Sequence, residues 1–239
     1  PAGLDYNFTY NGSTTFPTNA GDYIVEVTID EVNYQGSTTG TLTIAKASAE
    51  VSISNLSQVF TGSPKDVTVT TNPVGLDYGV TFNGISSFPT NVGNYFVVVT
   101  IDEVNYQGSA NDTLRISKAN TNIELSSNGT PSEFGAPVVL NASVTGSSVL
   151  SGTVQFYDGD VLLGTETLSD GEASHTVNLF SFGTHTLSAI YSGDDNNNGI
   201  TSSTYEQVVG KSNPSVSVTS DVHPSTYGGS VEFTATVTN

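Results

Sequence analysis

The chain has 239 residues with 24 Gly, 9 Pro and no Cys, and 23 acidic against 5 basic residues give it a formal net charge of −18. Such acidity argues against nucleic acid and anionic membrane surfaces as partners, because both require basic patches. The lack of Cys excludes disulfides, so each domain must be stable through its own apolar core. The longest apolar run, residues 96–99, is too short to span a membrane, and no membrane insertion is expected in this segment.

Residues 19–36 recur almost unchanged at residues 91–108, a spacing of 72 residues. Around this stretch residues 1–47 align without a gap to residues 73–119, and 31 of the 47 aligned positions are identical. Residue 23 and every second residue up to 29 are large and apolar, and so are the equivalents from 95 to 101. A period of two predicts a strand with one buried face. The chain therefore contains a tandem repeat built around a core strand.

Short strands separated by turn residues are expected throughout, and helix should be nearly absent. Asn11-Gly12 and Asn83-Gly84 are predicted turns, and the acidic stretches 30–34 and 102–106 are expected to be turns after the core strands. The predicted strands are residues 6–10, 23–29, 39–44, 50–54, 59–60, 66–71, 78–82, 95–101 and 113–116.

Several separated motifs of residues 47–119 keep a recognisable order. They are Phe60-Thr61-Gly62-Ser63-Pro64-Lys65, Phe88-Pro89-Thr90-Asn91-Val92-Gly93-Asn94-Tyr95, Asn105-Tyr106-Gln107-Gly108 and Ile116-Ser117-Lys118-Ala119. In this order they resemble the MBG repeats of large bacterial surface proteins. The resemblance implies a β-rich module of exported, adhesin-like proteins and carries over no catalytic residue.

From residue 120 the pattern changes to short strands with turn signals every eight to twelve residues, which is typical of a β-sandwich. The motifs at residues 153–160 and 183–194 resemble the group 3 bacterial immunoglobulin-like domain. Residues 213–239 then restart this domain, because Pro131-Ser132-Glu133-Phe134-Gly135 matches Pro224-Ser225-Thr226-Tyr227-Gly228 at a spacing of 93 residues.

These patterns predict an all-β fold of tandem immunoglobulin-like β-sandwich modules arranged as an elongated rod. The expected domains are an MBG-like repeat without its first strands (1–46), a complete MBG-like repeat (47–118), a group 3 immunoglobulin-like domain (119–211) and the opening strands of a second one (212–239). Neither Gly nor Pro lies in the joins at residues 44–53 and 116–125, so the linkers should be short and stiff.

The first and last modules are incomplete in sequence, and folded proteins avoid exposing half of a sandwich. One interpretation is that the 239 residues are a window from a longer chain whose adjacent domains cover both faces. The other is that neighbouring copies complete each other head to tail by donating strands.

The best chemical candidate is a calcium loop. Asp194, Asn196 and Asn198, followed by Gly199, fit the start of a D-x-N-x-N-G loop whose alternate oxygen ligands converge on a hard cation. The closing Glu of such a loop would lie at position 205, where Tyr205 stands instead. The alternative is a solvated loop rich in Asp and Asn. No cofactor is required, and calcium is the metal considered.

No enzymatic activity is expected. Phosphate loops, nucleophile elbows and zinc motifs are missing from the sequence. His175 and His185 share parity with apolar neighbours and are interpreted as strand residues rather than catalysts.

One difference between the repeats marks a candidate interface. Ile24 and Glu26 on the outer face of the first core strand become Phe96 and Val98 in the second. Either a neighbouring domain or subunit covers Phe96 and Val98, or they lie under a loop.

The sequence as a whole favours a non-enzymatic, extracellular, adhesin-type structural segment that forms a stiff stalk or filament at the cell surface. The alternatives are a surface module that binds carbohydrate or protein, and an accessory stalk of a secreted enzyme. Since immunoglobulin-like sandwiches host many functions, the fold alone does not decide between them.

Overall fold

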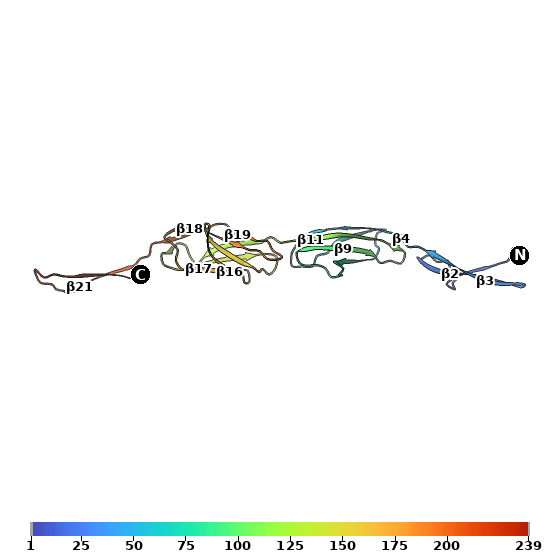
Figure 1. The fold of residues 1–239 in the computed structure, drawn as a ribbon, viewed down its shortest axis with the longest axis horizontal. Coiled ribbons are helices and arrows are strands. Elements are labelled where there is room, and N and C mark those ends of the chain that lie inside the picture. The colour runs from blue at the N-terminus through green and yellow to red at the C-terminus, as the bar shows by residue number, and fades with distance from the viewer. Residues whose placement is uncertain (1, 239) are drawn as a thin grey trace. The chain divides into compact units, whose positions relative to one another are not determined.

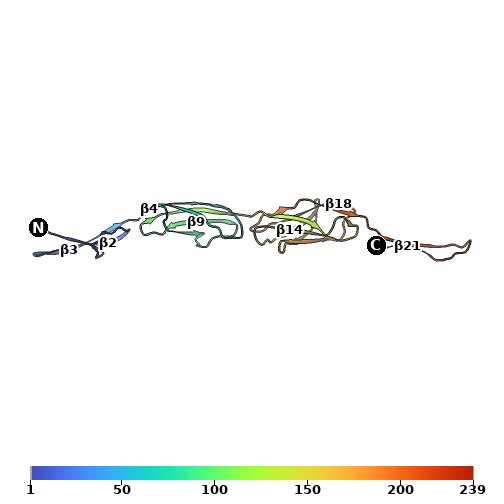
Figure 2. The ribbon, with the colours of Figure 1, turned by 180° about the vertical axis from the view of Figure 1, so that it is seen from behind.

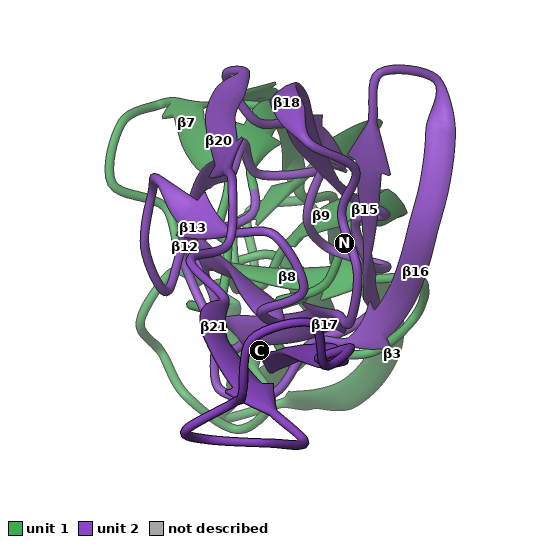
Figure 3. Cartoon of the chain, turned by 90° about the vertical axis from the view of Figure 1, so that its left-hand side faces the viewer, with its two compact units in different colours: residues 1–59, 63–117 green, residues 60–62, 118–239 purple. Residues whose placement is uncertain are grey.

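The computed structural model describes residues 2–238, and within this range all regular structure is β-strand. Figures 1 and 2 show the chain as a ribbon from two opposite sides, coloured along the sequence. Two compact units divide the chain (Figure 3): residues 1–59 with 63–117, and residues 60–62 with 118–239. In the described part of the chain no helix is long and apolar enough to cross a membrane. The prediction of an all-β fold is confirmed.

The first repeat, residues 1–46, forms an antiparallel sheet in the order β1-β2-β3. Asn11 and Gly12 adopt φ angles of 48° and 81°, and Asn83 and Gly84 adopt 51° and 81°, so both predicted turns are tight turns with two left-handed residues. The strands of this sheet are β1 (Asn7–Tyr10), β2 (Gly21–Glu31) and β3 (Tyr34–Ile44).

The second repeat, residues 47–118, has two main sheets, β5-β7 and β6-β11-β9-β8, and a short parallel pair, β4-β10. Its strands are β4 (Ala47–Ser48), β5 (Glu50–Ser54), β6 (Ser57–Val59), β7 (Thr68–Asn72), β8 (Tyr78–Phe82), β9 (Gly93–Ile101), β10 (Tyr106–Gln107) and β11 (Ser109–Ser117).

The apolar residues at every second position of β9 lie in the core, as expected. Val97 and Val99 are fully buried, and Leu114 of the neighbouring strand β11 is fully buried as well. A fully buried Val or Leu side chain contributes about 1.5–3 kcal/mol through removal of apolar surface from water. The outer face of the same strand stays accessible, because Phe96 is half exposed.

Residues 119–210 form a sandwich of a three-stranded sheet, β12-β14-β17, against a larger sheet, β13-β20-β18-β15-β16, in which β19 pairs with β18. Apolar side chains from both sheets, including the fully buried Leu140, Phe156 and Leu187, make one continuous core. The strands are β12 (Asn122–Ser127), β13 (Ser132–Glu133), β14 (Val138–Thr145), β15 (Thr153–Asp158), β16 (Val161–Thr167), β17 (Glu172–Val177), β18 (Gly183–Tyr191), β19 (Ile200–Thr201) and β20 (Tyr205–Gly210).

After the sandwich, β21 (Ser215–Ser220) and β22 (Phe233–Thr238) form an antiparallel pair. Val216 pairs with Val237, and Val218 pairs with Ala235. Residues that are direct partners in a pair of strands point to the same side of the sheet, so these four lie on one face.

The acidic stretch after the core strand differs between the repeats, and the turn predicted in its first copy is shorter than expected, because only Val32 and Asn33 lie between the paired Glu31 and Tyr34. Asp30 and Glu31 belong to β2, which runs directly into a tight hairpin with β3, whereas β9 ends at Ile101. The cause is local context, because β4 pairs with β10 in the second repeat and holds the stretch open as a loop. Identical sequence thus takes two conformations.

Gly108 and its equivalent Gly36 provide a matched test of the β4-β10 contact. A Cβ atom at Gly108 would lie 2.3 Å from the backbone oxygen of Ala49, whereas one at Gly36 would meet nothing within 4 Å. We expect Gly108→Ala to lower the free energy of unfolding by about 1–3 kcal/mol, because the backbone has to move apart. Gly36→Ala should change it by less than about 1 kcal/mol. Urea unfolding of the dilute chain measures both, and equal losses would contradict the contact.

Candidate functional site

The chain enters the second repeat through a set of hydrogen bonds centred on Lys46 and Ala47. Lys46 Nζ donates to the carbonyl oxygen of Glu103 at 2.6 Å, and the Ala47 N–H donates to the carbonyl oxygen of Asn105 at 2.8 Å. Two residues later the Ala49 N–H donates to the next alternate carbonyl, that of Gln107. Alternate carbonyls of one segment are the acceptors expected in a parallel strand pair.

The same arrangement occurs where the chain enters the sandwich. Lys118 Nζ donates to the carbonyl oxygen of Asp194 at 2.5 Å, and the Ala119 N–H donates to that of Asn196 at 3.0 Å. The Asn198 N–H returns a bond to the Ala119 carbonyl at 2.8 Å, and Ala119 is buried. We call these two sets the lysine clasps, one formed by Lys46 and Ala47 and the other by Lys118 and Ala119.

Asn105 extends the first clasp to the first repeat. Its side-chain oxygen accepts the N–H of Ala20 at 2.8 Å, and its Nδ2 donates to the side-chain oxygen of Asn19 at 3.0 Å. The side chain of Asn105 therefore contacts the first repeat while its backbone carbonyl binds Ala47.

The acceptor loop of the second clasp is organised by the carboxylate of Asp194. Its Oδ1 accepts the backbone N–H groups of Asn196 and Asn197 at 2.9 and 2.8 Å. Its Oδ2 accepts the Ser151 N–H at 3.1 Å and the Tyr191 hydroxyl at 3.2 Å. The buried Asn197 amide donates to both oxygens. The loop thus folds around a carboxylate that satisfies its backbone donors.

This environment shifts two pKa values. Burial alone would raise the pKa of Asp194, but the donated hydrogen bonds, first that of Asn196, outweigh it and lower that pKa. Burial, together with the negative charge of Asp194, raises the pKa of Tyr191 to about 12. The stable state of the loop therefore pairs an ionised Asp194 with a neutral tyrosine.

The three predicted calcium ligands have different surroundings. The carboxylate of Asp194 faces N–H and O–H donors, which a cation at these oxygens would have to displace. Asn196 contributes its carbonyl oxygen to the clasp, and the side chain of Asn198 donates to the Asn120 side-chain oxygen at 3.0 Å. Calcium binding by Asp194, Asn196 and Asn198 stays a prediction.

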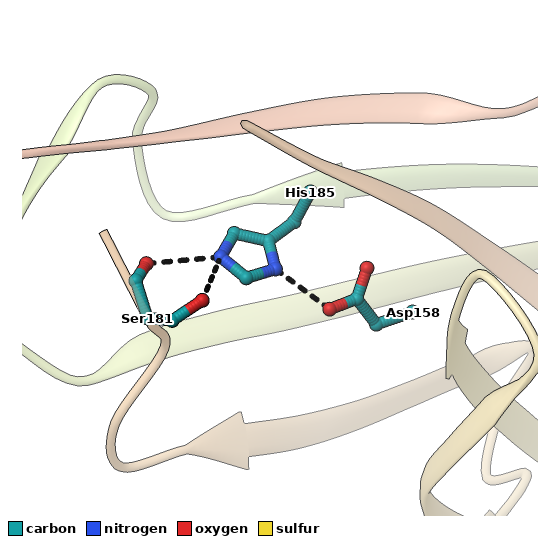
Figure 4. A network of polar contacts seen from close by, with 3 residues as sticks. All are labelled: Asp158, Ser181 and His185. Atoms are coloured by element: carbon teal, nitrogen blue, oxygen red, sulfur yellow. Dashed lines mark hydrogen bonds and ion pairs between the residues drawn. The ribbon is translucent and has the colours of Figure 1, made fainter. Parts of the chain in front are cut away.

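His185, Asp158 and Ser181 have the composition of a catalytic triad and lie together in the sandwich (Figure 4). His185 Nδ1 lies 2.6 Å from Asp158 Oδ2. His185 Nε2 lies 2.9 Å from the carbonyl oxygen of Ser181, closer than the 3.3 Å to the Ser181 hydroxyl.

A general base needs an unprotonated Nε2 that accepts the proton of serine. A carbonyl oxygen only accepts hydrogen bonds, so the contact with the Ser181 carbonyl is a hydrogen bond only when Nε2 carries a proton, the form that cannot act as a base. Burial lowers the pKa of His185, but the Ser181 carbonyl and the Asp158 carboxylate more than compensate and raise it above its ordinary value. The ring also packs against buried Phe180, with centroids 4.6 Å apart. The arrangement ties the loop before β18 to the end of β15.

His175 makes a second pair of the same kind. Its Nδ1 lies 2.8 Å from Glu166 Oε1, and its ring stacks on Phe156 at 5.9 Å. Gly164 lies against the ring, where a Cβ atom would come within 2.2 Å. Both histidines thus lie on strands, at β17 and β18, each beside a carboxylate.

Phe96 is half exposed and Val98 is partly buried. The Phe96 N–H donates to the side-chain oxygen of Asn83 at 2.8 Å, while the ring remains accessible to solvent. Their role as an interface stays a prediction.

Sequence reasoning missed the lysine clasps, although a signal was present. Lys46 and Lys118 occupy equivalent positions of the repeats, and Lys211 follows Lys118 at the spacing of 93 residues that relates the last two modules. Only 5 basic residues occur in the chain, and three of them recur in this way.

The Asp194 loop gives a direct test of the second clasp. Replacing Asp194 by Ala removes the acceptor of part-buried N–H donors, including that of the buried Asn197, and we expect it to lower the free energy of unfolding of the sandwich by about 1–3 kcal/mol at pH 7. Asp195→Ala is the matched control, because this neighbouring side chain is exposed.

The pH dependence has a defined sign. Because folding lowers the pKa of Asp194, its contribution is present above its unfolded pKa of about 3.9 and is lost as the pH falls through the folded value. The difference between wild type and Asp194→Ala in chemical denaturation should therefore shrink as the pH falls below about 3.9. A difference that is independent of pH would contradict the assignment of the stabilisation to the carboxylate.

Comparisons with known proteins follow the same division of the chain. The model of the MBG domain matches residues 1–48 and 49–120. The model of the bacterial Ig-like domain (group 3) matches residues 125–210. Both resemblances expected from sequence motifs are confirmed. A search of curated proteins gave no match.

Solved structures give weaker likenesses. Fibronectin(III)-like modules of Clostridium thermocellum CbhA are 24% identical, with a TM-score of 0.31, over 38% of this chain and 94% of theirs. Extracellular domains 3–5 of Drosophila OTK are 12% identical, with a TM-score of 0.35, over 80% of this chain and 71% of theirs. The S-layer protein rSbsC(31–844) is 14% identical, with a TM-score of 0.32, over 98% of this chain and 44% of its own.

The matched segments agree with the fold: the repeated β9-type core strand lies in the first family and the sandwich core in the second. The chain belongs to the MBG domain family through its two repeats, and it continues into a bacterial Ig-like domain of group 3.

Proposed function

We propose that this chain is a non-catalytic structural segment of an extracellular, adhesin-type surface protein, in which it acts as a stiff spacer. The observation that carries the proposal is the lysine clasp, which recurs where the chain enters the second repeat and where it enters the sandwich. Domains of the two matched families supply the modules, and each clasp fixes the linker to the module that it enters.

The clasps support stiffness for a simple reason. A linker keeps its freedom only while its backbone groups bind water, and here the N–H groups of Ala47 and Ala119 bind loop carbonyls instead. Each clasp also holds a lysine ammonium group on a carbonyl oxygen, and hydrogen bonds to charged groups are stronger than neutral ones. Rotation of a linker against the module that it enters would have to break both bonds.

A spacer of this kind predicts a narrow distance distribution across the second joint. Because the chain has no Cys, spin labels attach only at introduced cysteines, and the exposed residues Val74 and Val161 are suitable sites. We expect one narrow distance peak from pulsed electron resonance on Val74→Cys, Val161→Cys. Adding Ala119→Pro, which removes the N–H of the clasp, should broaden it at least twofold.

Ala119→Gly is the matched control, because it keeps the N–H group, and it should stay closer to the parent distribution than the proline variant. Thermal unfolding of each variant verifies that the two units remain folded. A parent distribution already as broad as that of the proline variant would rule out a stiff spacer.

A further inference from the structure

The outer face of the sheet that contains β9 and β11 (Figure 1) differs in charge from the equivalent face of the first repeat. Asn94 pairs with Arg115 on this face, and Phe96 and Val98 follow on the same side of β9. Four differences between the repeats lie here, namely Asn94 in place of Asp22, Phe96 in place of Ile24, Val98 in place of Glu26 and Arg115 in place of Thr43. Together they remove two negative charges and add one positive charge.

The outward positions of this sheet carry no acidic residue. They are Ser57 and Val59 of β6, Ser109, Asn111, Thr113, Arg115 and Ser117 of β11, Asn94, Phe96, Val98 and Thr100 of β9, and Gly79 and Thr81 of β8. By contrast, the outer faces of the other main sheet of the second repeat and of the two sheets of the sandwich carry Glu50, Glu124 and Glu206. Because two copies with a net charge of −18 repel each other, this face is where they approach at the lowest electrostatic cost.

Arg115 is the only arginine of the chain, and its side chain is exposed. None of the hydrogen bonds and ion pairs among the described residues involves its guanidinium group. Phe96, one step along the sheet, is 50% exposed. Arginine and aromatic residues are enriched at protein interfaces, so both side chains are suited to a partner.

Two carboxylates lie at the opposite end of the same sheet. Asp77 comes directly before β8 and Asp102 directly after β9, and the Asp102 N–H donates to the Asp77 carbonyl oxygen at 2.9 Å. Both side chains are exposed, and both residues continue the alternation of outward positions in their strands. The face thus has a basic end, an apolar centre and an acidic end. A second copy turned end for end presents the complementary order.

From the charge change, the acid-free face and the opposed ends, we propose that two copies pair through the outer faces of their β6-β11-β9-β8 sheets. The strands run antiparallel, with a two-fold axis near Val98. Arg115 of each copy then faces Asp102 of the other copy, and Phe96 of each copy packs beside Val98 of the other. Since the same surface serves both copies, the contact closes as a dimer.

The equivalent face of the first repeat is the other surface that a second copy offers, and its charge disfavours it. Its Asp22 and Glu26 would lie against the apolar centre of the partner sheet, with Arg115 alone to pair them. A carboxylate that is buried without a partner is costly. The second repeat therefore pairs with itself.

The size of the face sets the strength of the contact. Four strands about 4.8 Å apart and nine residues at about 3.3 Å each give about 600 Å² per copy. A stable complex buries about 800 Å² per partner, so we expect a weak dimer with a dissociation constant on the order of 0.1 mM. Neighbouring stalks on one surface would gain from it, because tethering raises the effective concentration. Only this last consequence rests on the proposed spacer role.

Sedimentation equilibrium of the full chain tests the dimer, at up to about 0.5 mM and in salt of about 0.3 M that screens the charge of each copy. We expect the average mass of the wild type to rise towards that of a dimer. Phe96→Glu should weaken association at least tenfold. Ile24→Glu is the matched control, because it adds the same charge at the equivalent exposed position of the first repeat, and it should stay within twofold of wild type. Thermal unfolding verifies that each variant remains folded.

An exchange of charges tests the antiparallel arrangement. Arg115→Asp and Asp102→Arg each place like charges opposite each other and should weaken the dimer at least fivefold. Asp102→Arg also lowers the net negative charge of the chain, so its loss of association cannot come from general repulsion. The double variant restores opposite charges across the interface and should return to within twofold of wild type.

Three results would overturn the proposal. They are a wild type that stays monomeric at the highest concentration, equal losses in Phe96→Glu and Ile24→Glu, and a double variant that associates no better than the single ones. None of them bears on the stiffness of the joints, which is measured within one chain, so the two proposals fail separately.

Discussion

The N–H group of Ala119 binds the carbonyl oxygen of Asn196, and this bond fixes the start of the sandwich to the loop that follows β18. The loop takes its shape from Asp194, whose carboxylate collects donors from Ser151, Asn196 and Asn197. Without that carboxylate these N–H groups would lose an acceptor, and at the buried Asn197 an unsatisfied donor is a costly defect. The Asp194 side chain therefore connects the loop that binds Ala119, where the sandwich begins, to the buried Tyr191 of strand β18.

The two MBG repeats show how neighbours decide the conformation of one sequence. Residues 28–36 and 100–108 are identical, yet the first set forms a hairpin and the second an open loop that accepts Ala47 and Ala49. Local preference allows both conformations. The contact with β4 selects the second, because its backbone hydrogen bonds are available only while the loop stays open.

Much of the fold was predictable because its signals are local. The alternation of apolar residues located the buried face of β9, and the Asn-Gly pairs at 11–12 and 83–84 located tight turns.

The clasps were not predictable in the same way, since Lys118 and Asp194 are far apart in sequence and meet only through the topology of the sandwich. The contacts of His185 with Asp158 and Ser181 were not predictable either, because the fold of the sandwich brings these residues together. The D-x-N-x-N-G pattern suggested a cation site at Asp194. In the structure, hydrogen-bond donors surround the Asp194 carboxylate. Whether such a carboxylate faces donors or a cation depends on the backbone geometry of the loop, which the pattern does not give.

Backbone hydrogen bonds at Ala47 and Ala119 hold each linker on the module that it enters. Amide hydrogen exchange at these two residues tests whether the bonds persist in solution. We expect both amides to exchange slowly, at rates near those of amides in the central strands β9 and β18. Exchange as fast as that of an unpaired linker amide at either alanine would contradict this expectation.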